Sequence, residues 1–535
     1  MKTRRLTFYL LREGIDEFDD ALDHDKSESA KELETSDLLD GKFLYIEPRQ
    51  SNPGWVGFVQ PVVTEHLDDI RSASTAALLL LKTGGRIFAV TFGFGRSLLN
   101  LSNIEYQFGL RVALNLIDPA HIRSLDTKTF EDLVVTTNTQ TSKSAELPAF
   151  GIDVSKDILR AVTGEPRDSE IATRISGADS LVMNMKIKAE ELPEICDKLL
   201  AAYERSDYKT DFGWIDQLTL VRDEERVKQL DQMLVGQLRN GGSSSTHLAM
   251  PEPIDWQDID GFQIAGTYRH LYEELDLDEY LIRLGGSVKK ITLSLLKSRF
   301  VSVRFGRSGA DDKRWNLYQC MVSEQNLDGK LFVLIESRWF AVDATLLDEV
   351  NRFVDGIPES QLNLVPARAG EVEASYNERL ATSDAANFIK LDARIKRPGG
   401  ATSGIEFCDV FSRSGDLIHV KRKSRSATLS HLFAQGSVSA VTFLNDGYYR
   451  DQLRDLIESN EDLADGSKWL ELVPASGDAV DQSKYCVTFA VVTNSSRDGR
   501  DWLPFFSKLN LMQQGKQLSG LGFKLALSKI PIAAE

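Results

Sequence analysis

The sequence predicts a multidomain α+β protein, with mixed α/β regions in its N-terminal part and a further α/β domain at its C-terminal end. The chain has 535 residues, which at roughly 100 to 200 residues per domain corresponds to three or four domains, or to two large ones. Hydrophobic residues make up 42% and charged residues 27% of the chain, which is typical of a protein with a packed core. Segments of strand type also alternate with segments of helical spacing.

The clearest local structure is a β-hairpin near the N-terminus. Two apolar runs, residues 76–82 and 86–92, flank the pair Gly84 and Gly85. Two glycines supply the positive φ angles that a tight hairpin turn requires. Because the runs are apolar on both faces, we expect central strands.

Three helices and two boundaries organise the first two thirds of the chain. Helical spacing predicts helices over 190–203, 223–238 and 268–284. A glycine- and serine-rich linker at 240–245 and a loop containing Pro366 mark the boundaries. The predicted domains are an N-terminal mixed α/β domain (1–245), a middle α/β domain (246–366) and a C-terminal domain (367–535).

Charge and cysteine usage restrict the function classes. The net charge of −17 argues against a generic nucleic-acid coat, although a local basic site remains compatible with it. The four cysteines form no CxxC motif, so we expect no zinc ribbon and a reducing, cytoplasmic location. The start lacks the features of a signal peptide, and the longest apolar run, residues 76–81, is too short for a membrane span.

The segment that predicts chemistry lies between residues 371 and 436. Its expected elements are a helix (371–381, with Val372, Tyr376 and Leu380 stacked), a strand (405–412), a turn (414–416), a second strand (417–421) and a helix (427–440). Alternation places His419 and Lys421 on one face of the second strand. A three-residue turn would set Asp409 opposite Lys421 and Phe411 opposite His419. An acid, an imidazole and an ammonium group would then meet on a sheet face that should otherwise be apolar.

Basic residues surround this segment. The window 390–425 holds nine Lys or Arg against four Asp or Glu, in a chain that is acidic overall. Such a reversal favours binding to a phosphate backbone, for which Arg422, Lys423 and Arg425 are candidates. On the following helix, His431 and Gln435 share a polar face with Thr428.

The order of these residues resembles the PD-(D/E)xK nucleases, typified by restriction endonucleases and Mrr-like enzymes. That pattern is a helix with an acid, a strand with Asp, a hairpin, a strand with (E/D)xK and a helix with a polar residue. The resemblance covers about 65 to 120 residues. It implies a restriction-endonuclease-like fold with catalytic Glu378 (alternatively Glu371), Asp409, Lys421 and Gln435. Asp409 and Glu378 would bind Mg²⁺ or Mn²⁺, which would lower the pKa of a bound water.

His419 departs from that pattern, because the family usually has an acid two residues before the lysine. Neutral imidazole is a poor ligand for Mg²⁺. Three alternatives stay open: His419 binds the metal with Mn²⁺ favoured, Asp409 and Glu378 suffice, or the site is inactive. A structural role for His419 is a further reading.

The whole chain is also similar to a sporadically distributed family of uncharacterised bacterial proteins found near restriction and anti-phage genes. The similarity rests on residues 7–12 (TFYLLR), 92–96 (FGFGR) and 418–436 (IHVKRKS followed by LSHLFAQG). It implies a role in defence, with nucleic acid, chiefly DNA, as the partner and no membrane.

We therefore expect a metal-dependent nuclease that acts in anti-phage defence. The alternative is a catalytically inactive nucleic-acid-binding or sensor subunit, and a scaffold that binds no nucleic acid is a third hypothesis. Whether the protein forms a homo-oligomer or joins other defence subunits stays open.

Overall fold

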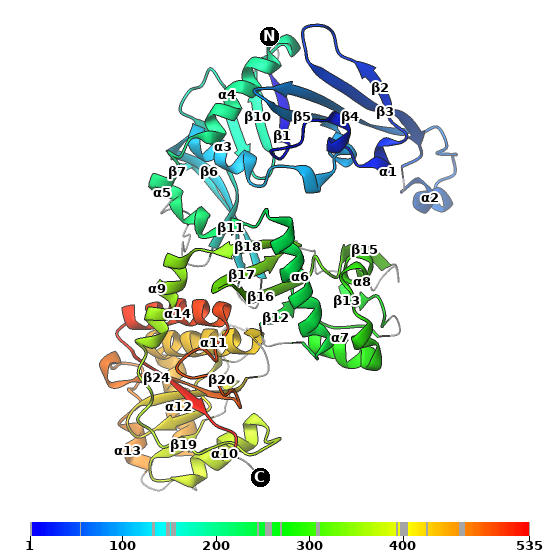
Figure 1. Cartoon of the computed structure of the whole chain (residues 1–535). Helices are drawn as coiled ribbons and strands as arrows, with labels where there is room; N and C mark the ends of the chain where they lie inside the picture. The colour runs from blue at the N-terminus through cyan, green and yellow to red at the C-terminus, as the bar shows by residue number, and fades with distance from the viewer. Residues whose placement is uncertain are drawn as a thin grey trace. The chain divides into compact units, whose positions relative to one another are not determined.

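The computed structural model describes residues 3–53, 55–130, 134–145, 150, 157–242, 245–251, 259–267, 270–305, 311–391, 394–395, 405–423, 426–459 and 466–533. The chain has a mixed α+β, multidomain fold, as the sequence predicts (Figure 1). It divides into two compact units, residues 1–128 with 136–215 and residues 129–135 with 216–535. The linker expected at 240–245 therefore falls within the second unit.

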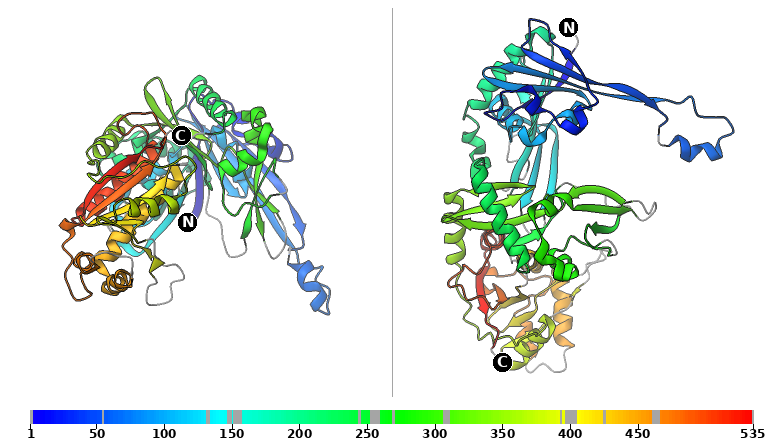
Figure 2. Two further views of the ribbon diagram at one scale, coloured as in Figure 1. Left: turned by 90° about the horizontal axis from the view of Figure 1, so that it is seen from below. Right: turned by 45° about the vertical axis from the view of Figure 1, so that its right-hand side comes forward.

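The first unit is built on a ten-stranded sheet of order β2-β3-β4-β5-β1-β10-β9-β8-β6-β7. Its strands are β1 (Arg4–Leu10), β2 (Lys31–Glu34), β3 (Gly41–Ser51), β4 (Ser72–Thr83), β5 (Arg86–Gly93), β6 (Ile117–Phe130), β7 (Val134–Ala145), β8 (Asp157–Pro166), β9 (Arg174–Gly177) and β10 (Leu181–Met185). Its helices are α1 (His24–Ser27), α2 (Val56–Val59), α3 (Phe108–Leu116), α4 (Leu192–Glu204) and α5 (Lys209–Phe212). In Figure 2, β3 and β4 extend as a long ribbon to α2 at its tip.

The predicted hairpin of this unit is confirmed. Strands β4 and β5 pair up to Thr83 and Arg86, and Gly84 and Gly85 have φ angles of +56° and +73°. Alternate leucines of β4 enter two different buried clusters, on the two faces of the sheet. The strands are therefore apolar on both faces because both faces are covered.

The second unit contains three larger sheets and nine described helices. The sheet orders are β11-β18-β17-β16-β12, β13-β14-β15 and β19-β22-β23-β24-β25, and β20 pairs with β21. The first two sheets comprise β11 (Leu218–Leu220), β12 (Thr246–Leu248), β13 (Ile259–Ile264), β14 (Phe300–Phe305), β15 (Asp311–Asn316), β16 (Met321–Leu327), β17 (Lys330–Ile335) and β18 (Arg338–Val342). The helices along this part are α6 (Glu224–Arg239), α7 (Leu277–Leu284), α8 (Leu293–Ser298) and α9 (Ala344–Asp355).

The expected helix over 268–284 is wrong in its first half. Helix α7 begins at Leu277, after Asp276, whose side chain accepts a hydrogen bond from the Glu279 N–H. Upstream of this cap, Tyr272 instead forms a β-bridge with Phe262 and is buried. The helices expected over 190–203 and 223–238 are confirmed as α4 and α6.

The C-terminal part of this unit is the sheet that carries the residues of interest. Its elements are α10 (Glu373–Ser383), β19 (Phe388–Lys390), β20 (Arg394–Ile395), β21 (Ile405–Glu406), β22 (Val410–Ser412), β23 (Asp416–Arg422), α11 (Ser426–Asn445), α12 (Gly447–Glu458), α13 (Gly466–Leu470), β24 (Cys486–Val492), α14 (Phe505–Gly520) and β25 (Lys524–Ile530). Strands β19, β22 and β23 are antiparallel, whereas β23, β24 and β25 are parallel. Strands β24 and β25 complete this sheet.

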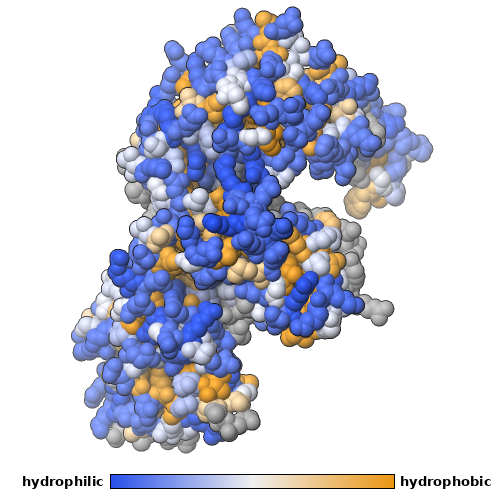
Figure 3. All heavy atoms as spheres, viewed as in Figure 1, coloured by the Kyte–Doolittle hydropathy of each residue, from blue (hydrophilic) through white to orange (hydrophobic). Residues whose placement is uncertain are grey.

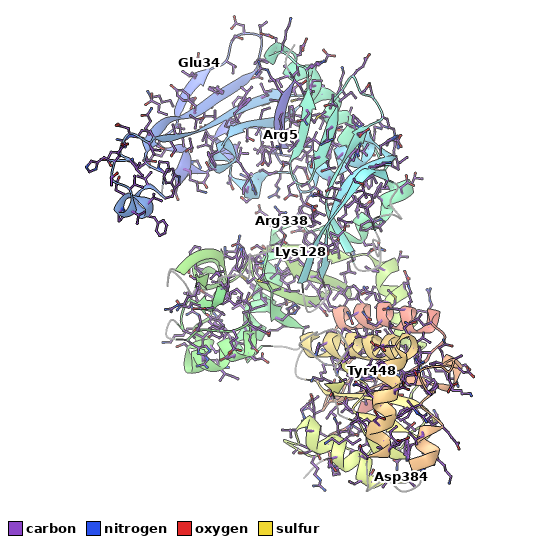
Figure 4. All side chains as sticks on the ribbon, turned by 180° about the vertical axis from the view of Figure 1, so that it is seen from behind. Arg5, Glu34, Lys128, Arg338, Asp384 and Tyr448 are labelled. Carbon is purple, nitrogen blue, oxygen red and sulfur yellow. The ribbon has the colours of Figure 1, made fainter. Side chains whose placement is uncertain are left out.

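Two apolar clusters hold this sheet between helices. One contains buried residues of α11, α12 and α14, and the other contains Tyr376 and Leu380 of α10. Val372, which was expected to stack with them, is 64% exposed because it is the residue before the helix, with φ −77° and ψ 155°. In Figure 4, Asp384 marks the end of α10 and Tyr448 marks α12.

Among the described helices, none is long and apolar enough to cross a bilayer. On the face seen in Figure 3, hydrophilic residues predominate and hydrophobic ones form scattered groups.

Candidate active site

The hairpin of β22 and β23 has a different register from the expected one. Phe411 lies opposite Leu417, two residues before its expected partner His419. The expected pairing of Asp409 with Lys421 across the ladder is wrong for the same reason.

Asp416 explains the shift. It was expected in the turn, but it is the first residue of β23 and is only 9% exposed. Its carboxylate accepts hydrogen bonds of 2.6 Å from the hydroxyls of Ser412 and Ser414. These bonds satisfy the buried charge and place the turn over residues 413–415.

The shifted register leaves one edge of β23 open, here defined as the stretch from Val420 to Arg422. The pairing with β22 covers only Leu417 and Ile418. N–H groups two residues apart in a strand point to the same edge, about 6.6 Å apart. The Val420 and Arg422 N–H groups therefore both point to this edge, beyond the end of β22.

Two carboxylates accept these two N–H groups. Asp409 Oδ2 accepts the Val420 N–H at 2.8 Å, and Glu373 Oε1 accepts the Arg422 N–H at 3.1 Å. The acids therefore lie beside the same edge, one from the residue before β22 and one from the start of α10. Lys421 lies between the two N–H groups in the sequence.

Lys421 completes this group of charges. Its Nζ donates to Glu373 Oε2 at 2.8 Å. The side chains of Lys421 and Glu373 are 25% and 35% exposed, so the ion pair is open to solvent. The ammonium group and the two carboxylates thus gather at one accessible edge, although the sequence predicted a different register.

One face of helix α10 contacts both Lys421 and Asp409. Glu373 and Asn377 are four residues apart, so they lie one above the other on a helix. Glu373 binds Lys421, and Asn377 Nδ2 donates to Asp409 Oδ1 at 2.8 Å. The helix therefore fixes the positions of Asp409 and Lys421 relative to each other.

The two acids expected from α10 have other partners. Glu378 is 61% exposed and forms an ion pair with Lys390 at 3.1 Å. Glu371 accepts two bonds from Arg379, of 2.8 and 2.7 Å. This bidentate pairing, together with the Arg368 N–H, lowers the pKa of Glu371 to about 2. Glu371 therefore secures the loop before α10.

A hollow of about 550 Å³ lies beside this edge. Its walls are residues 370–374 and Arg422. Arg422 is half-buried, and its guanidinium donates to the Arg368 carbonyl at 3.0 Å. Glu373 belongs both to this hollow and to the open edge, so the edge is approachable from outside.

His419 lies away from the acids. It is fully buried, next to the Phe489 ring, and a Cβ added to Gly436 of α11 would lie 3.3 Å from its Cδ2. Neither ring nitrogen has a hydrogen-bond partner within the described chain. Burial lowers the pKa of His419 to about 4, so the imidazole is neutral at neutral pH.

The remaining predicted residues spread over several elements. Gln435 Nε2 donates to Glu406 Oε2 of β21 at 2.6 Å, and His431 is exposed on α11. Arg425 lies outside the described residues. Lys423 is half-buried and donates through Nζ to the Trp502 carbonyl.

The open edge carries two carboxylates, those of Asp409 and Glu373. In the described part of the chain, no group of three or more His, Cys, Asp or Glu side chains is arranged to hold a metal. Mg²⁺, however, is commonly held by one or two carboxylates together with substrate phosphates and water. Asp409 and Glu373 are the two carboxylates at this edge that such an ion would use.

Comparison with known proteins identifies the family of the chain. The model of the family of unknown function DUF6119 matches residues 6–531, which is nearly the whole chain. The chain belongs to this family. No curated protein and no solved structure matches it.

In this DUF6119 protein, sequence reasoning did not single out Glu373, the α10 acid that pairs with Lys421. Glu371, Glu373 and Glu378 all fall in the predicted helix, and only the position of the helix start separates them. The signal available was the spacing of Glu373 and Asn377, which is the spacing of residues on one helix face.

Proposed function

We propose that the open edge of β23 is the active site of a metal-dependent nuclease, with DNA as the favoured substrate, that acts in the bacterial cytoplasm in defence against phage. The observation that carries this proposal is the pair of carboxylates, Asp409 and Glu373, on consecutive outward N–H groups of one strand edge, with Lys421 between them.

The order of elements supports the same function. Helix α10, strands β19, β22 and β23, helix α11 and strand β24 follow one another. The first three strands are antiparallel and β24 is parallel to β23. This arrangement agrees with the PD-(D/E)xK order of helix, strand, hairpin, strand and helix. In this proposal Asp409 and Lys421 correspond to its Asp and Lys, and Glu373 takes the place of Glu378 as the helix acid.

Each residue of the edge has a part that its contacts suit. Asp409 and Glu373 would hold a divalent cation, which would polarise the phosphate. Lys421 places its ammonium group beside the scissile phosphate, where it stabilises the negative charge of the transition state. Asn377 keeps Asp409 oriented, and Arg422 contributes positive charge at the rim of the hollow.

The test compares two glutamates of the same helix. The full-length protein is incubated with plasmid, linear and single-stranded DNA and with RNA, each with Mg²⁺ or Mn²⁺. We expect Glu373→Gln to lower cleavage by about 100-fold or more, because it removes charge where the metal binds. Glu378→Gln, which changes an exposed partner of Lys390, should cleave like the wild type. Lys421→Met should lose about 100-fold or more.

Glutamine keeps an acceptor for the Arg422 N–H, so Glu373→Gln should fold normally, and a melting curve checks this. Equal cleavage by Glu373→Gln and Glu378→Gln would contradict the proposal. So would a wild-type protein that cleaves none of the four nucleic acids with either metal.

A second candidate is a nucleic-acid-binding or sensor subunit without cleavage. The buried, neutral His419 favours it, because this residue stands where the PD-(D/E)xK pattern usually has a metal-binding acid. Binding that weakens steeply with salt, in the absence of cleavage by the wild type, would support this candidate.

A further inference from the structure

Three cations gather at the carboxyl ends of the parallel strands. Lys423 follows β23, Arg497 lies in the loop after β24, and Lys529 is near the end of β25. In parallel sheets, ligands commonly bind beyond the carboxyl ends of the strands. We call these three residues the carboxyl-end basic cluster.

Contacts show that the three side chains converge. Lys529 Nζ donates to the Arg497 carbonyl at 3.1 Å, and Arg497 Nη1 donates to the Asp501 carbonyl at 3.4 Å. Lys423 Nζ donates to the Trp502 carbonyl in the same loop. All three cations therefore bond to backbone oxygens, and within the described part of the chain none of them forms an ion pair with a carboxylate.

Like charges at short range raise the free energy of the cluster. Burial, with Arg497 and Lys529 close by, lowers the pKa of Lys423 to about 8, although the Glu324 carboxylate acts in the opposite direction. An anion bound among the three cations would relieve this repulsion.

Three carboxylates near the cluster have other donors. Asp501 pairs with Lys508 at 3.2 Å, and Glu359 pairs with Arg500 at 3.2 Å. Glu324 accepts the N–H groups at the start of α14, from Phe505 at 2.7 Å and Phe506 at 2.8 Å. These three carboxylates are thus engaged with other donors, and Glu359 also accepts the backbone N–H of Lys529 at 3.3 Å. Asp498, the residue after Arg497, is the fourth acid near the cluster.

The cluster lies within reach of the open edge of β23. Lys421, Val491 and Lys529 are in register across β23, β24 and β25. Paired residues of neighbouring strands point to the same face, and two strand spacings are about 10 Å. The backbones at Lys421 and Lys529 are therefore about 10 Å apart, with the buried Val491 between them, and a nucleic-acid strand bound at both would pass beyond the carboxyl ends of the strands.

We propose that the carboxyl-end basic cluster binds a backbone phosphate of the nucleic-acid strand whose scissile phosphate lies at the open edge of β23. The position of the strand rests on the proposed function, but the binding requires no metal. The cluster fixes the strand without reading its sequence.

The test compares two double variants, each of which removes two positive charges at one end of the parallel strands. The double variant Arg497→Gln with Lys529→Gln changes the cluster. The control, Lys484→Gln with Lys524→Gln, changes two exposed lysines at the opposite ends of β24 and β25. Anisotropy of a fluorescein-labelled single-stranded DNA oligonucleotide is measured in EDTA over a salt series, and inorganic phosphate is added as a competitor.

We expect the cluster variant to bind about tenfold or more weakly at low salt, with a salt slope smaller by about 0.7, because the contact with one phosphate is lost. The control should bind like the wild type, and millimolar inorganic phosphate should not displace the oligonucleotide. Equal binding by the two double variants, displacement by phosphate, or a wild-type protein that does not bind would overturn the inference.

The two proposals fail separately. If the cluster variant loses binding while no protein cleaves DNA, the cluster stands and the hydrolysis does not. If cleavage requires Glu373 but both double variants bind alike, the hydrolysis stands and the cluster does not.

Discussion

The carboxylates at the two ends of the parallel strands β23, β24 and β25 differ in burial and in their hydrogen-bond donors. At the beginning, the buried Asp416 is enclosed by hydroxyl donors, including Ser412 and Ser414. At the carboxyl end, Asp409 and Glu373 accept N–H groups of an open strand edge, and Lys421 is accessible beside them. Whether an aspartate here stabilises the fold or can bind a ligand therefore depends on its hydrogen-bond donors and its exposure. The residue type alone does not reveal which role it has.

The largest expected effect is a loss of cleavage that distinguishes Asp409 from Asp416. Asp409→Asn should lower cleavage by about 100-fold or more, because it removes a carboxylate from the metal. Its amide oxygen can still accept the Val420 N–H, and its NH₂ can donate to Asn377 Oδ1, a buried acceptor without a partner in the described chain. Melting should therefore change little.

Asp416→Asn should do the reverse. It should retain cleavage and lose about 1 to 3 kcal/mol of unfolding free energy, because charge-assisted hydrogen bonds to a buried group are weakened. Urea unfolding and the cleavage assay give both values. If Asp416→Asn abolished cleavage while Asp409→Asn did not, the comparison of the two ends would be wrong.

The sequence predicts the elements of this region better than its register. Strands β24 and β25 and the hairpin β4–β5 follow from apolar runs and glycines, which are local signals. The register of β22 and β23 depends on where Asp416 finds its hydroxyl donors, one of which is Thr488 on a strand far along the chain. The choice of Glu373 over Glu378 likewise depends on contacts across the fold.

The next effect concerns His419 and pH. Its pKa of about 4 lies below the unfolded value near 6.5, so between these values the unfolded chain binds the proton more readily. The free energy of unfolding should consequently fall as pH decreases, and His419 should account for about 2 kcal/mol of this fall between pH 7.5 and pH 5. His419→Leu should lack this component in urea unfolding at the two pH values.

The same variant tests whether His419 takes part in chemistry. With a buried, neutral imidazole away from the acids, His419→Leu should keep cleavage near the wild-type rate at pH 7.5. A folded His419→Leu protein without cleavage would show that His419 acts in the site, and would favour the reading in which it binds the metal.

The smallest effect is the pH dependence of binding at the carboxyl-end basic cluster. Lys423, which faces Arg497, Lys529 and Glu324, has a pKa of about 8 and loses its charge as pH rises through that value. Oligonucleotide affinity in EDTA should therefore fall by up to about fivefold between pH 7 and pH 9, the contribution of one phosphate contact. Lys423→Met should bind with a lower, pH-independent affinity over this range. An identical pH profile for both proteins would exclude Lys423 from the cluster.

The most direct measurement is Mn²⁺ binding by electron paramagnetic resonance, which counts the ions left free in solution. The wild type and Glu378→Gln should bind Mn²⁺ alike, and Asp409→Asn and Glu373→Gln should each weaken binding by about tenfold or more. A wild-type protein that binds no Mn²⁺ with or without an oligonucleotide, or equal binding by all four proteins, would contradict a metal site at the open edge of β23.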